Sequence, residues 1–319
     1  MAKIIKNINL AVEELLAGEA VALPTETVYG LAVNALDAES VLKIFTIKKR
    51  PHFDPLIVHI SDISEINKYA KYIPDDVFLL AEKFSPGPIT FVVKKRNLIP
   101  DLVTAGLDTV AIRIPSHKLF RKVLQNLPFP LAAPSANMFG RISPTSAEEV
   151  KKELNGKISF ILDGGKSKIG IESTVIAFKN NNAVILRPGF ITKDKIEKVL
   201  RRKVEYYSNK ILHNVSSPGA LKIHYSPMTP LYLCNDNFNI NILKKLNAVY
   251  LDLNKFNNLN ELASDLFSEI RKLDEKSFNF IVTKKTDNEG LGYAINDRLE
   301  KASHGKIRFS DNKPIITKK

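Results

Sequence analysis

The sequence predicts a mixed α/β fold, with helices packed around a twisted sheet and a smaller α/β domain after it. Short runs rich in β-branched residues alternate with segments of helical periodicity across residues 1–205. Consecutive apolar runs between residues 158 and 187 have no helical segment between them, so part of the sheet should be antiparallel. After residue 228, strand and helix patterns alternate again, which predicts a small parallel, Rossmann-like sheet.

The first domain, residues 1–205, carries most of the predicted elements. Strands are predicted at residues 21–23, 55–60, 89–93, 109–114, 130–133, 159–162, 174–178 and 183–186. Helices are predicted at residues 7–17, 38–48, 75–84, 117–126, 146–154 and 192–202. Gly18 is expected at the C′ position that ends the first helix, and Asp37 is expected to cap the second helix.

A linker and a second domain are predicted beyond residue 205. Residues 206–228 lose periodicity and contain the turn-forming sequence SSPG, so we expect them to form the linker. In residues 229–319, strands are predicted at 229–234, 248–252 and 278–283, and helices at 239–246, 259–273 and 293–303. Neither GxGxxG nor a Walker A sequence occurs, so we expect no dinucleotide or ordinary P-loop site.

Composition indicates a globular protein without a membrane span. Of the 319 residues, 44% are hydrophobic and 25% are charged, and no run of about 18 apolar residues occurs. The first residues lack the apolar stretch of a secretory signal. Cys234 is the single cysteine, which excludes an internal disulfide and any cysteine-based metal cluster. We therefore expect a cytoplasmic protein.

The net charge of +13 leaves two kinds of partner open. Residues 1–210 contain 31 Lys and Arg against 22 Asp and Glu, so the excess lies mainly in this part. Such charge attracts nucleotide phosphates or RNA. No patch of interleaved aromatic and basic residues occurs, which weighs against tight RNA binding.

Three polar segments follow strand-like or helical runs and are candidates for an anion site. They are PTETVYG at residues 24–30, KKRP at residues 48–51 and SAN at residues 135–137. Lys48 and Arg50 complement the negative end of a helix, or they clamp phosphates. The segments supply hydroxyls, amides and fixed cations but no evident nucleophile or metal cage, which favours binding of a nucleotide and a small polar partner.

Arg113 and Arg187 each lie within an apolar strand. Arginine is rarely buried unless it is paired. Each is therefore either half of a buried ion pair or a bidentate ligand for a carboxylate in a cleft. The residues alone leave both interpretations open.

Small and hydroxyl residues follow two further strands. Small side chains in APSAN, residues 133–137, allow backbone amides to approach a ligand. Ser143 and Thr145 either cap the following helix or bind an anion. Ser173 lies in a loop with several amide donors, after Gly164 and Gly165.

Taken together, these segments resemble the L-threonylcarbamoyladenylate synthases, the YrdC-like family, in its two-domain form. The resemblance rests on PTETVYGL (24–31), KKRP (48–51), DPLIVH (54–59), SPGPIT (85–90), TVAIRIP (109–115), APSAN (133–137), ESTV (172–175) and LRPG (186–189). It extends to SPGALKIHYSP (217–227) and GLGYAINDR (290–298) in the linker and second domain.

The resemblance implies a YrdC-like catalytic domain, a linker that covers the active site as a lid, and a nucleotidyltransferase reaction. Such enzymes convert L-threonine, bicarbonate or CO2, and ATP into threonylcarbamoyl-AMP and pyrophosphate, with Mg²⁺ accompanying ATP. The product serves the threonylcarbamoyladenosine modification of tRNA, through a separate downstream transferase complex.

The resemblance also implies roles for individual residues. Lys48 and Arg50 would act in catalysis. The threonine pocket would be lined by Thr27, His59, Arg113, Ala133 and Ser173. ATP would be surrounded by Arg50, Asp54, Thr109, Ser135, Ser143, Arg187 and Tyr225.

Two positions depart from the family pattern. Asp54 stands where an asparagine is common, and its carboxylate would need to meet Mg²⁺ or Lys48 to lie beside phosphates. ALKI at residues 220–223 replaces a more usual Met-Lys-Tyr-Lys. Two alternatives remain: a non-catalytic protein that binds double-stranded RNA, and a carbamoyl-transfer module that hydrolyses ATP only with a partner.

Overall fold

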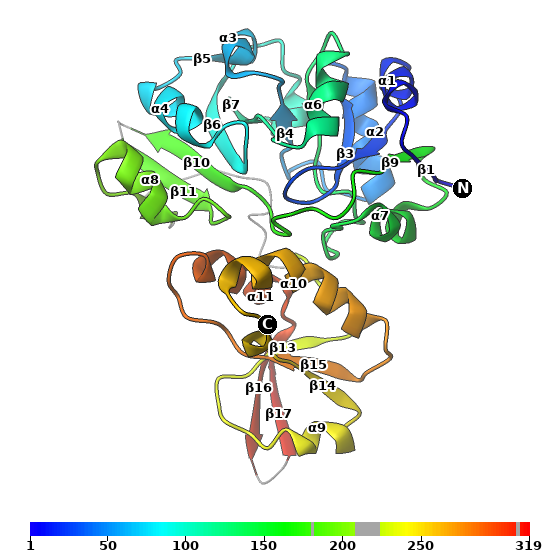
Figure 1. Ribbon diagram of the computed structural model, residues 1–319, viewed down its shortest axis with the longest axis vertical. Helices are drawn as coiled ribbons and strands as arrows, with labels where there is room; N and C mark the ends of the chain where they lie inside the picture. Colours follow the sequence, from blue (N-terminus) through cyan, green and yellow to red (C-terminus); the bar gives the residue numbers. More distant parts are fainter. Residues whose placement is uncertain (180–181, 208–223, 311–312) are drawn as a thin grey trace. The chain divides into compact units, whose positions relative to one another are not determined.

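The computed structural model describes residues 1–179, 182–207, 224–310 and 313–319. The chain divides into two compact units (Figure 1). Residues 1–139 and 144–220 form the first unit, and residues 140–143 and 221–319 form the second. Most of the predicted linker, residues 208–223, lies outside the described residues, and so does most of the SPGALKIHYSP motif.

The first unit is built on one large mixed sheet. Its strands run in the order β1-β9-β2-β3-β8-β4-β7-β6-β10-β11-β12, and β5 pairs with β6. Their bounds are β1 (Lys3–Ile5), β2 (Val21–Leu23), β3 (Gly30–Asn34), β4 (Ile57–His59), β5 (Ala70–Lys71), β6 (Ile89–Lys95), β7 (Thr109–Arg113), β8 (Leu131–Ala132), β9 (Phe160–Leu162), β10 (Thr174–Lys179), β11 (Asn182–Arg187) and β12 (Glu205–Tyr206). The predicted mixed α/β fold is confirmed.

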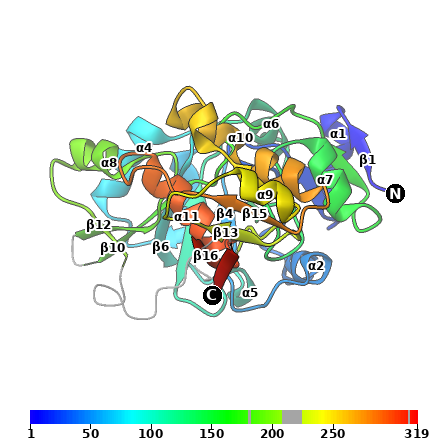
Figure 2. The same ribbon diagram turned by 90° about the horizontal axis from the view of Figure 1, so that it is seen from below.

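Helices pack around this sheet; six of them lie at the predicted places, whereas η1, α3 and α5 were not predicted. They are α1 (Ile8–Leu16), α2 (Ala38–Lys48), η1 (Ile63–Glu65), α3 (Ile66–Tyr69), α4 (Asp75–Phe84), α5 (Asp101–Thr104), α6 (Lys118–Gln125), α7 (Ala147–Leu154) and α8 (Lys193–Leu200). Helices α4 and α8 lie side by side (Figures 1 and 2). The predicted cap of α2 by Asp37 is confirmed, and Gly18 has the expected positive φ of 78° after α1. The side chain that caps α7 is Ser146, three residues after Ser143.

Part of the sheet is antiparallel, as predicted, and this part extends beyond residues 158–187, because the pairs β2–β3, β3–β8, β4–β8, β5–β6 and β6–β7 are antiparallel too. Strand β10 does pair antiparallel with β11. Strand β9, however, pairs parallel with β1 and β2, far along the sheet from β10. The segment between Leu162 and Thr174 is long enough to cross the sheet, and the sequence pattern could not indicate this crossing. Strands β1, β3, β5 and β12 were not predicted, because they are short or continue directly from a polar motif.

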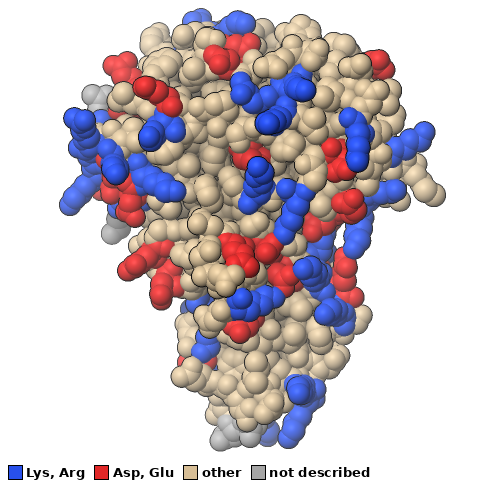
Figure 3. Space-filling model, in the orientation of Figure 1, with Lys and Arg blue, Asp and Glu red and all other residues tan. Residues whose placement is uncertain are grey.

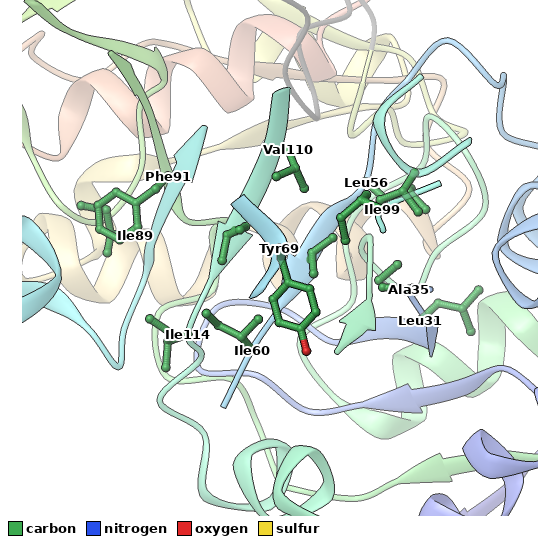
Figure 4. Packing of buried hydrophobic residues seen from close by; sticks show 14 of the residues in the cluster. Leu31, Ala35, Leu56, Ile60, Tyr69, Ile89, Phe91, Ile99, Val110 and Ile114 are labelled. Atoms are coloured by element: carbon green, nitrogen blue, oxygen red, sulfur yellow. The ribbon is translucent and has the colours of Figure 1, made fainter. Parts of the chain in front are cut away.

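Alternating residues of the strands fill the two faces of the first sheet. Leu31 and Val33 belong to the larger cluster, whereas Ala32 between them belongs to a second cluster with Phe120 of α6. Figure 4 shows part of the larger cluster, with Phe91 of β6 among its labelled residues. Because both faces are covered, the strand ends and their loops are where polar side chains can gather.

The second unit contains a separate sheet in the order β14-β15-β13-β16-β17. Its elements are β13 (Leu231–Leu233), α9 (Asn241–Lys245), β14 (Ala248–Leu251), η2 (Leu253–Lys255), α10 (Leu259–Asp274), β15 (Phe280–Thr283), α11 (Gly292–Ala302), β16 (Gly305–Ser310) and β17 (Lys313–Lys318). Strands β13, β14 and β15 are parallel, as predicted; β16 pairs parallel with β13, and β17 returns antiparallel to β16. The β16–β17 hairpin was not predicted. None of the described helices combines the length and the apolarity that crossing a membrane requires.

Candidate active site

Strand register places candidate threonine-pocket residues at neighbouring strand ends. His59 ends β4, Arg113 ends β7, and the two are partners in the parallel β4–β7 ladder. Ala133 follows β8, and its N–H donates to the carbonyl of Ile57 at 3.0 Å. On the other side of Arg113, Thr90 of β6 is its antiparallel partner. His59, Arg113 and Thr90 therefore form one row across three adjacent strands, whereas Ala133 lies opposite Ile57, two residues before His59 on β4.

Ser173 extends this row to β10. Its Oγ lies 2.7 Å from the Oγ1 of Thr90, and both side chains are buried. Arg187, which ends β11, donates from Nη2 to the Oγ of Ser173 at 3.1 Å. The same guanidinium donates from Nε to the backbone carbonyl of Ser173 at 3.1 Å. Arg187 is thereby tied to the threonine side of the predicted site as well as being a candidate for ATP.

Arg113 is held in a buried ion pair. Its Nη2 lies 2.6 Å from the Oε1 of Glu26, and both side chains are almost fully buried. The other carboxylate oxygen of Glu26 accepts from the backbone N–H of Ser116 at 3.1 Å. Of the two interpretations left open by the sequence, the ion pair is thus present, and it leaves other guanidinium donors for a ligand.

Thr27 lies beside Glu26 in a turn organised by Thr25. The Oγ1 of Thr25 accepts from the backbone N–H groups of Thr27 and Val28 at 3.1 and 3.2 Å. The same hydroxyl lies 2.8 Å from the Oγ1 of Thr27 and donates to the carbonyl of Val28. Threonine hydroxyls stabilise turns in this way. The turn therefore fixes Thr27 and links it, through Glu26, to Arg113.

His59 is a neutral residue of this row. It is 2% exposed and its ring packs against that of Phe120 at 5.2 Å between centroids. Burial, and then the positive charge of Arg113, lower the pKa of His59 to about 3. The imidazole is therefore uncharged at neutral pH and can offer one donor and one acceptor to a polar substrate.

Lys48 holds the backbone of the SAN segment, residues 135–137. Its Nζ donates to the carbonyl of Ser135 at 2.6 Å and also to the carbonyl of Asn137. Burial, and then the nearby charge of Arg50, lower the pKa of Lys48 well below its usual range. Lys48 thus fixes the backbone that presents Ser135, which itself forms an antiparallel bridge with Gly30.

Arg50 and Asp54 form a second buried ion pair, with 2.9 Å between Nη2 and Oδ2. Arg50 also donates from Nε to the carbonyl of Asp54 and from Nη2 to that of Pro55. Asp54 stands where an asparagine is common in the family, and its charge is therefore neutralised by Arg50. The partner expected from the sequence was Mg²⁺ or Lys48.

Three predicted ATP-binding residues do not belong to the row. Thr109 begins β7, four residues before Arg113, which corresponds to about 13 Å along an extended strand. Ser143 and Tyr225 belong to the second unit. Tyr225 is fully buried there, with its ring 5.2 Å from that of Phe267 and 5.6 Å from the guanidinium carbon of Arg298.

Sequence reasoning assigned no role to several residues that build the site. Glu26 and Thr25 lie inside the PTET motif, and their polarity in a buried segment was the available signal. Thr90 is a hydroxyl in an apolar strand. Tyr29 bridges two chain segments, because its hydroxyl accepts from the N–H of Gly164 at 3.0 Å and donates to the carbonyl of Gly165 at 2.8 Å.

Comparison with known families agrees with this fold. The profile of the family described as "Telomere recombination", which covers Sua5, YciO and YrdC proteins, matches residues 13–189. A second profile, "Threonylcarbamoyl-AMP synthase, C-terminal domain", matches residues 191–304. The fold and these two profiles define a two-domain protein of the YrdC-like class.

Individual relatives narrow this class to one family. The chain is 37% identical to the threonylcarbamoyl-AMP synthase of Pyrococcus abyssi, covering 94% of this chain and 95% of the relative. It is 37% identical to that of Bacillus subtilis, covering 91% and 90%. The crystal structure of P. abyssi Sua5 with L-threonine superposes with a TM-score of 0.87 at 34% identity, covering 95% and 97%. The chain belongs to the threonylcarbamoyl-AMP synthase family.

Proposed function

We propose that this protein is an L-threonylcarbamoyladenylate synthase. It joins L-threonine, CO2 derived from bicarbonate, and ATP into threonylcarbamoyl-AMP and releases pyrophosphate. The product then supplies the threonylcarbamoyl group for modification of tRNA by a separate transferase complex. The proposal is supported by family membership and by the solved P. abyssi relative that holds L-threonine.

One structural observation carries the threonine part of the proposal. His59 and Arg113 are register partners, Ala133 follows the neighbouring β8, Ser173 contacts Thr90 of β6, and Thr27 adjoins Glu26, which pairs with Arg113. The row offers a guanidinium for the carboxylate of threonine, and a neutral imidazole and hydroxyls for its polar groups. Ala133 leaves space for the substrate because its side chain is small.

The reaction needs no nucleophile from the protein. The threonine amine forms a bond to the carbon of CO2 and loses a proton, which gives a carbamate. A carbamate oxygen then forms a bond to the α-phosphorus of ATP, while the bond from this phosphorus to the bridging oxygen of pyrophosphate breaks. Pyrophosphate leaves with the electron pair. The protein accelerates these steps by orienting the substrates and stabilising negative charge.

The nucleotide side of the site is proposed to use Arg50, Ser135 and Arg187, with Lys48 as support. Lys48 and Arg50 follow each other at the end of α2, and Lys48 holds the backbone of Ser135. Rigid support matters because a displacement of the phosphate-binding groups weakens catalysis steeply. Asp54, Thr109, Ser143 and Tyr225 stay predictions from the family resemblance.

Mg²⁺ fits this site as a companion of ATP. Among the described residues, no group of three or more His, Cys, Asp or Glu side chains could form a metal cage. Mg²⁺ commonly keeps waters and substrate phosphates as its main ligands, so such a cage is not required. The carboxylate of Asp54 is a candidate ligand among the proposed ATP-binding residues, and it pairs with Arg50. When bound, the ion would neutralise charge on the triphosphate.

The RNA-binding alternative is not favoured. The four cations of the candidate site are buried: Lys48, Arg50, Arg113 and Arg187 are 1%, 7%, 4% and 4% exposed. Binding of an RNA backbone requires exposed cations that neutralise successive phosphates. On the face drawn in Figure 3, Lys and Arg side chains are interspersed with acidic ones.

Pyrophosphate release by the isolated protein tests the proposed function. We expect release from ATP only when threonine and bicarbonate are both present, and loss of release when either is omitted. Release that requires a partner protein would favour the carbamoyl-transfer module instead. ATP-independent binding to double-stranded RNA with steep salt dependence, and no pyrophosphate, would favour the RNA-binding protein.

A further inference from the structure

Glu26 is a buried carboxylate whose two oxygens both have defined partners. Oε1 accepts from Nη2 of Arg113 at 2.6 Å, and Oε2 accepts from the backbone N–H of Ser116 at 3.1 Å. The residue is 6% exposed. Its backbone is also held, because its carbonyl accepts from the N–H of Ile169 at 2.8 Å. Glu26 therefore has a single defined position and can fix whatever it binds.

Arg113 is the group that Glu26 fixes. Besides the ion pair, the Nε of Arg113 donates to the carbonyl of Gly87 at 3.4 Å. Two of the three guanidinium nitrogens thus have protein partners, and in the described part of the chain no oxygen accepts from Nη1. An arginine side chain has several rotatable bonds, and its ordering costs conformational entropy. Contacts at Nε and Nη2 remove that freedom before any ligand arrives.

The remaining nitrogen suits a substrate carboxylate. A guanidinium can serve two carboxylates at once when each uses a different part of its planar donor array. Glu26 occupies Nη2, which leaves Nη1 for a second anion. Glu26 also compensates the buried charge of Arg113, and an uncompensated buried charge would be strongly destabilising.

We propose that Glu26 is a positioning residue for threonine binding, which orients the guanidinium of Arg113 so that its free edge receives the substrate carboxylate. This inference rests on the proposed function, because it takes threonine as the ligand. Glu26 acts through Arg113 rather than by touching the substrate. Glu26 also precedes Thr27 in the turn that the hydroxyl of Thr25 organises.

An opposite effect of Glu26 is conceivable on charge alone. A carboxylate beside Arg113 repels a second carboxylate, so its neutralisation would strengthen threonine binding if competition dominated. The positioning role predicts weaker binding instead. The sign of the change in threonine affinity therefore separates the two effects.

Glu26→Gln provides the test, because it keeps the size of the side chain but replaces one acceptor oxygen with a donor. We expect the threonine KM to rise roughly tenfold, which is the scale of a lost charge-assisted hydrogen bond, while the ATP KM stays within about twofold. Glu26→Asp keeps the charge on a shorter stem and should bind threonine with intermediate affinity. Glu13→Gln, at an exposed site on α1, is the matched control and should change neither constant.

A substrate analogue without a carboxylate tests whether Glu26 acts on the binding of this group. Threoninol lacks the carboxylate of threonine but keeps its amine and hydroxyl. Calorimetric titration should show that Glu26→Gln weakens threonine roughly tenfold and leaves threoninol affinity within about twofold. A merely structural role would weaken both ligands alike, and that result would overturn the inference. Unchanged or tighter threonine binding would overturn it as well.

Failure of this inference and failure of the proposed function give different results. If wild-type protein binds threonine but releases no pyrophosphate, the proposed function fails, and the calorimetric titrations still test the role of Glu26 in threonine binding. If wild-type protein releases pyrophosphate normally and Glu26→Gln binds threonine as well as wild type does, only the inference fails. Should Glu26→Gln not fold, Glu26→Asp gives the same comparison with a smaller expected change.

Discussion

At the scale of the residue, the charged side chains of the candidate site are buried and hold defined partners in the folded chain. Arg113 pairs with Glu26 and Arg50 pairs with Asp54, while Lys48 donates to backbone carbonyls. Burial lowers the local dielectric, which strengthens interactions with an incoming anion and holds the donors in place. The substrates therefore meet groups whose orientation is set in advance.

Arg113 offers the most direct residue-level prediction. We expect Arg113→Ala to raise the threonine KM by about 100-fold or more, because it removes the carboxylate ligand and leaves Glu26 buried without its ion-pair partner. Arg113→Lys keeps the charge but loses the planar fork, so its effect should be smaller. Steady-state kinetics with threonine varied at saturating ATP measure both. A threonine KM that Arg113→Ala leaves unchanged would remove Arg113 from the threonine site.

His59 predicts a specific dependence of stability on pH. Its pKa is about 3 in the folded protein, against an ordinary value of 6.5. Between these values the unfolded chain binds a proton that the folded chain does not, so stability falls as pH drops from about 6.5 towards 3. One such group contributes a slope of up to about 1.4 kcal/mol per pH unit.

Urea denaturation at several pH values checks this prediction. Between pH 4 and 6.5, His59→Asn should reduce the slope of unfolding free energy against pH relative to wild type, by an amount that corresponds to about one proton. Burial also lowers the pKa of His117, whose contribution is common to both proteins and cancels in the comparison. His52→Gln, at an exposed position, is the control. An equal slope in wild type and His59→Asn would mean that His59 is not held neutral.

At the scale of the element, the end of α10 organises the second unit. Asp274 is the last residue of this helix, where a negative charge is unfavourable for the helix dipole. Its Oδ1 accepts from the N–H of Thr229 at 2.6 Å, and its Oδ2 accepts from the N–H of Met228 at 2.9 Å and from Arg141 at 3.3 Å. Asp274 thus joins residues 140–143 to the segment that enters β13.

We expect Asp274→Ala to destabilise the second unit by about 2–4 kcal/mol, because it leaves a part-buried backbone donor and Arg141 without this acceptor. Hydrogen exchange followed by mass spectrometry should show faster exchange at residues 224–233, and urea denaturation should give the loss of stability. Asp287→Ala, at an exposed loop position, is the control. Protection of residues 224–233 that equals the wild-type value would show that Asp274 does not hold this segment.

At the scale of the whole molecule, the periodicity of apolar residues predicts the helices and strands that depend on local sequence pattern. The helices α1, α2, α4, α6, α7 and α8 and the parallel strands β13 to β15 were predicted because their apolar spacing is regular, whereas α3 and α5, of four residues each, were not predicted. The place of β9 beside β1 was not predictable, since strand order depends on contacts between segments far apart in sequence. The β16–β17 hairpin was missed because few of its residues are apolar and buried.

The candidate site was predictable to a similar degree. The resemblance indicates which side chains gather, and the register of β4, β7 and β6 brings His59 and Arg113 together with Thr90. It does not indicate the partners of the charged groups. The Glu26–Arg113 and Arg50–Asp54 pairs arise from the meeting of segments in three dimensions, and only the structure reveals them.

The central claim is that two substrates are brought together so that threonine carbamate attacks ATP. Incubation of the purified protein with threonine, ATP, Mg²⁺ and ¹³C-bicarbonate, followed at once by mass spectrometry, tests it most directly. The account predicts threonylcarbamoyl-AMP with one ¹³C atom in the carbamoyl group, in an amount equal to the pyrophosphate released. Pyrophosphate with an unlabelled adenylate of threonine, or with AMP alone even at the earliest times, would contradict it.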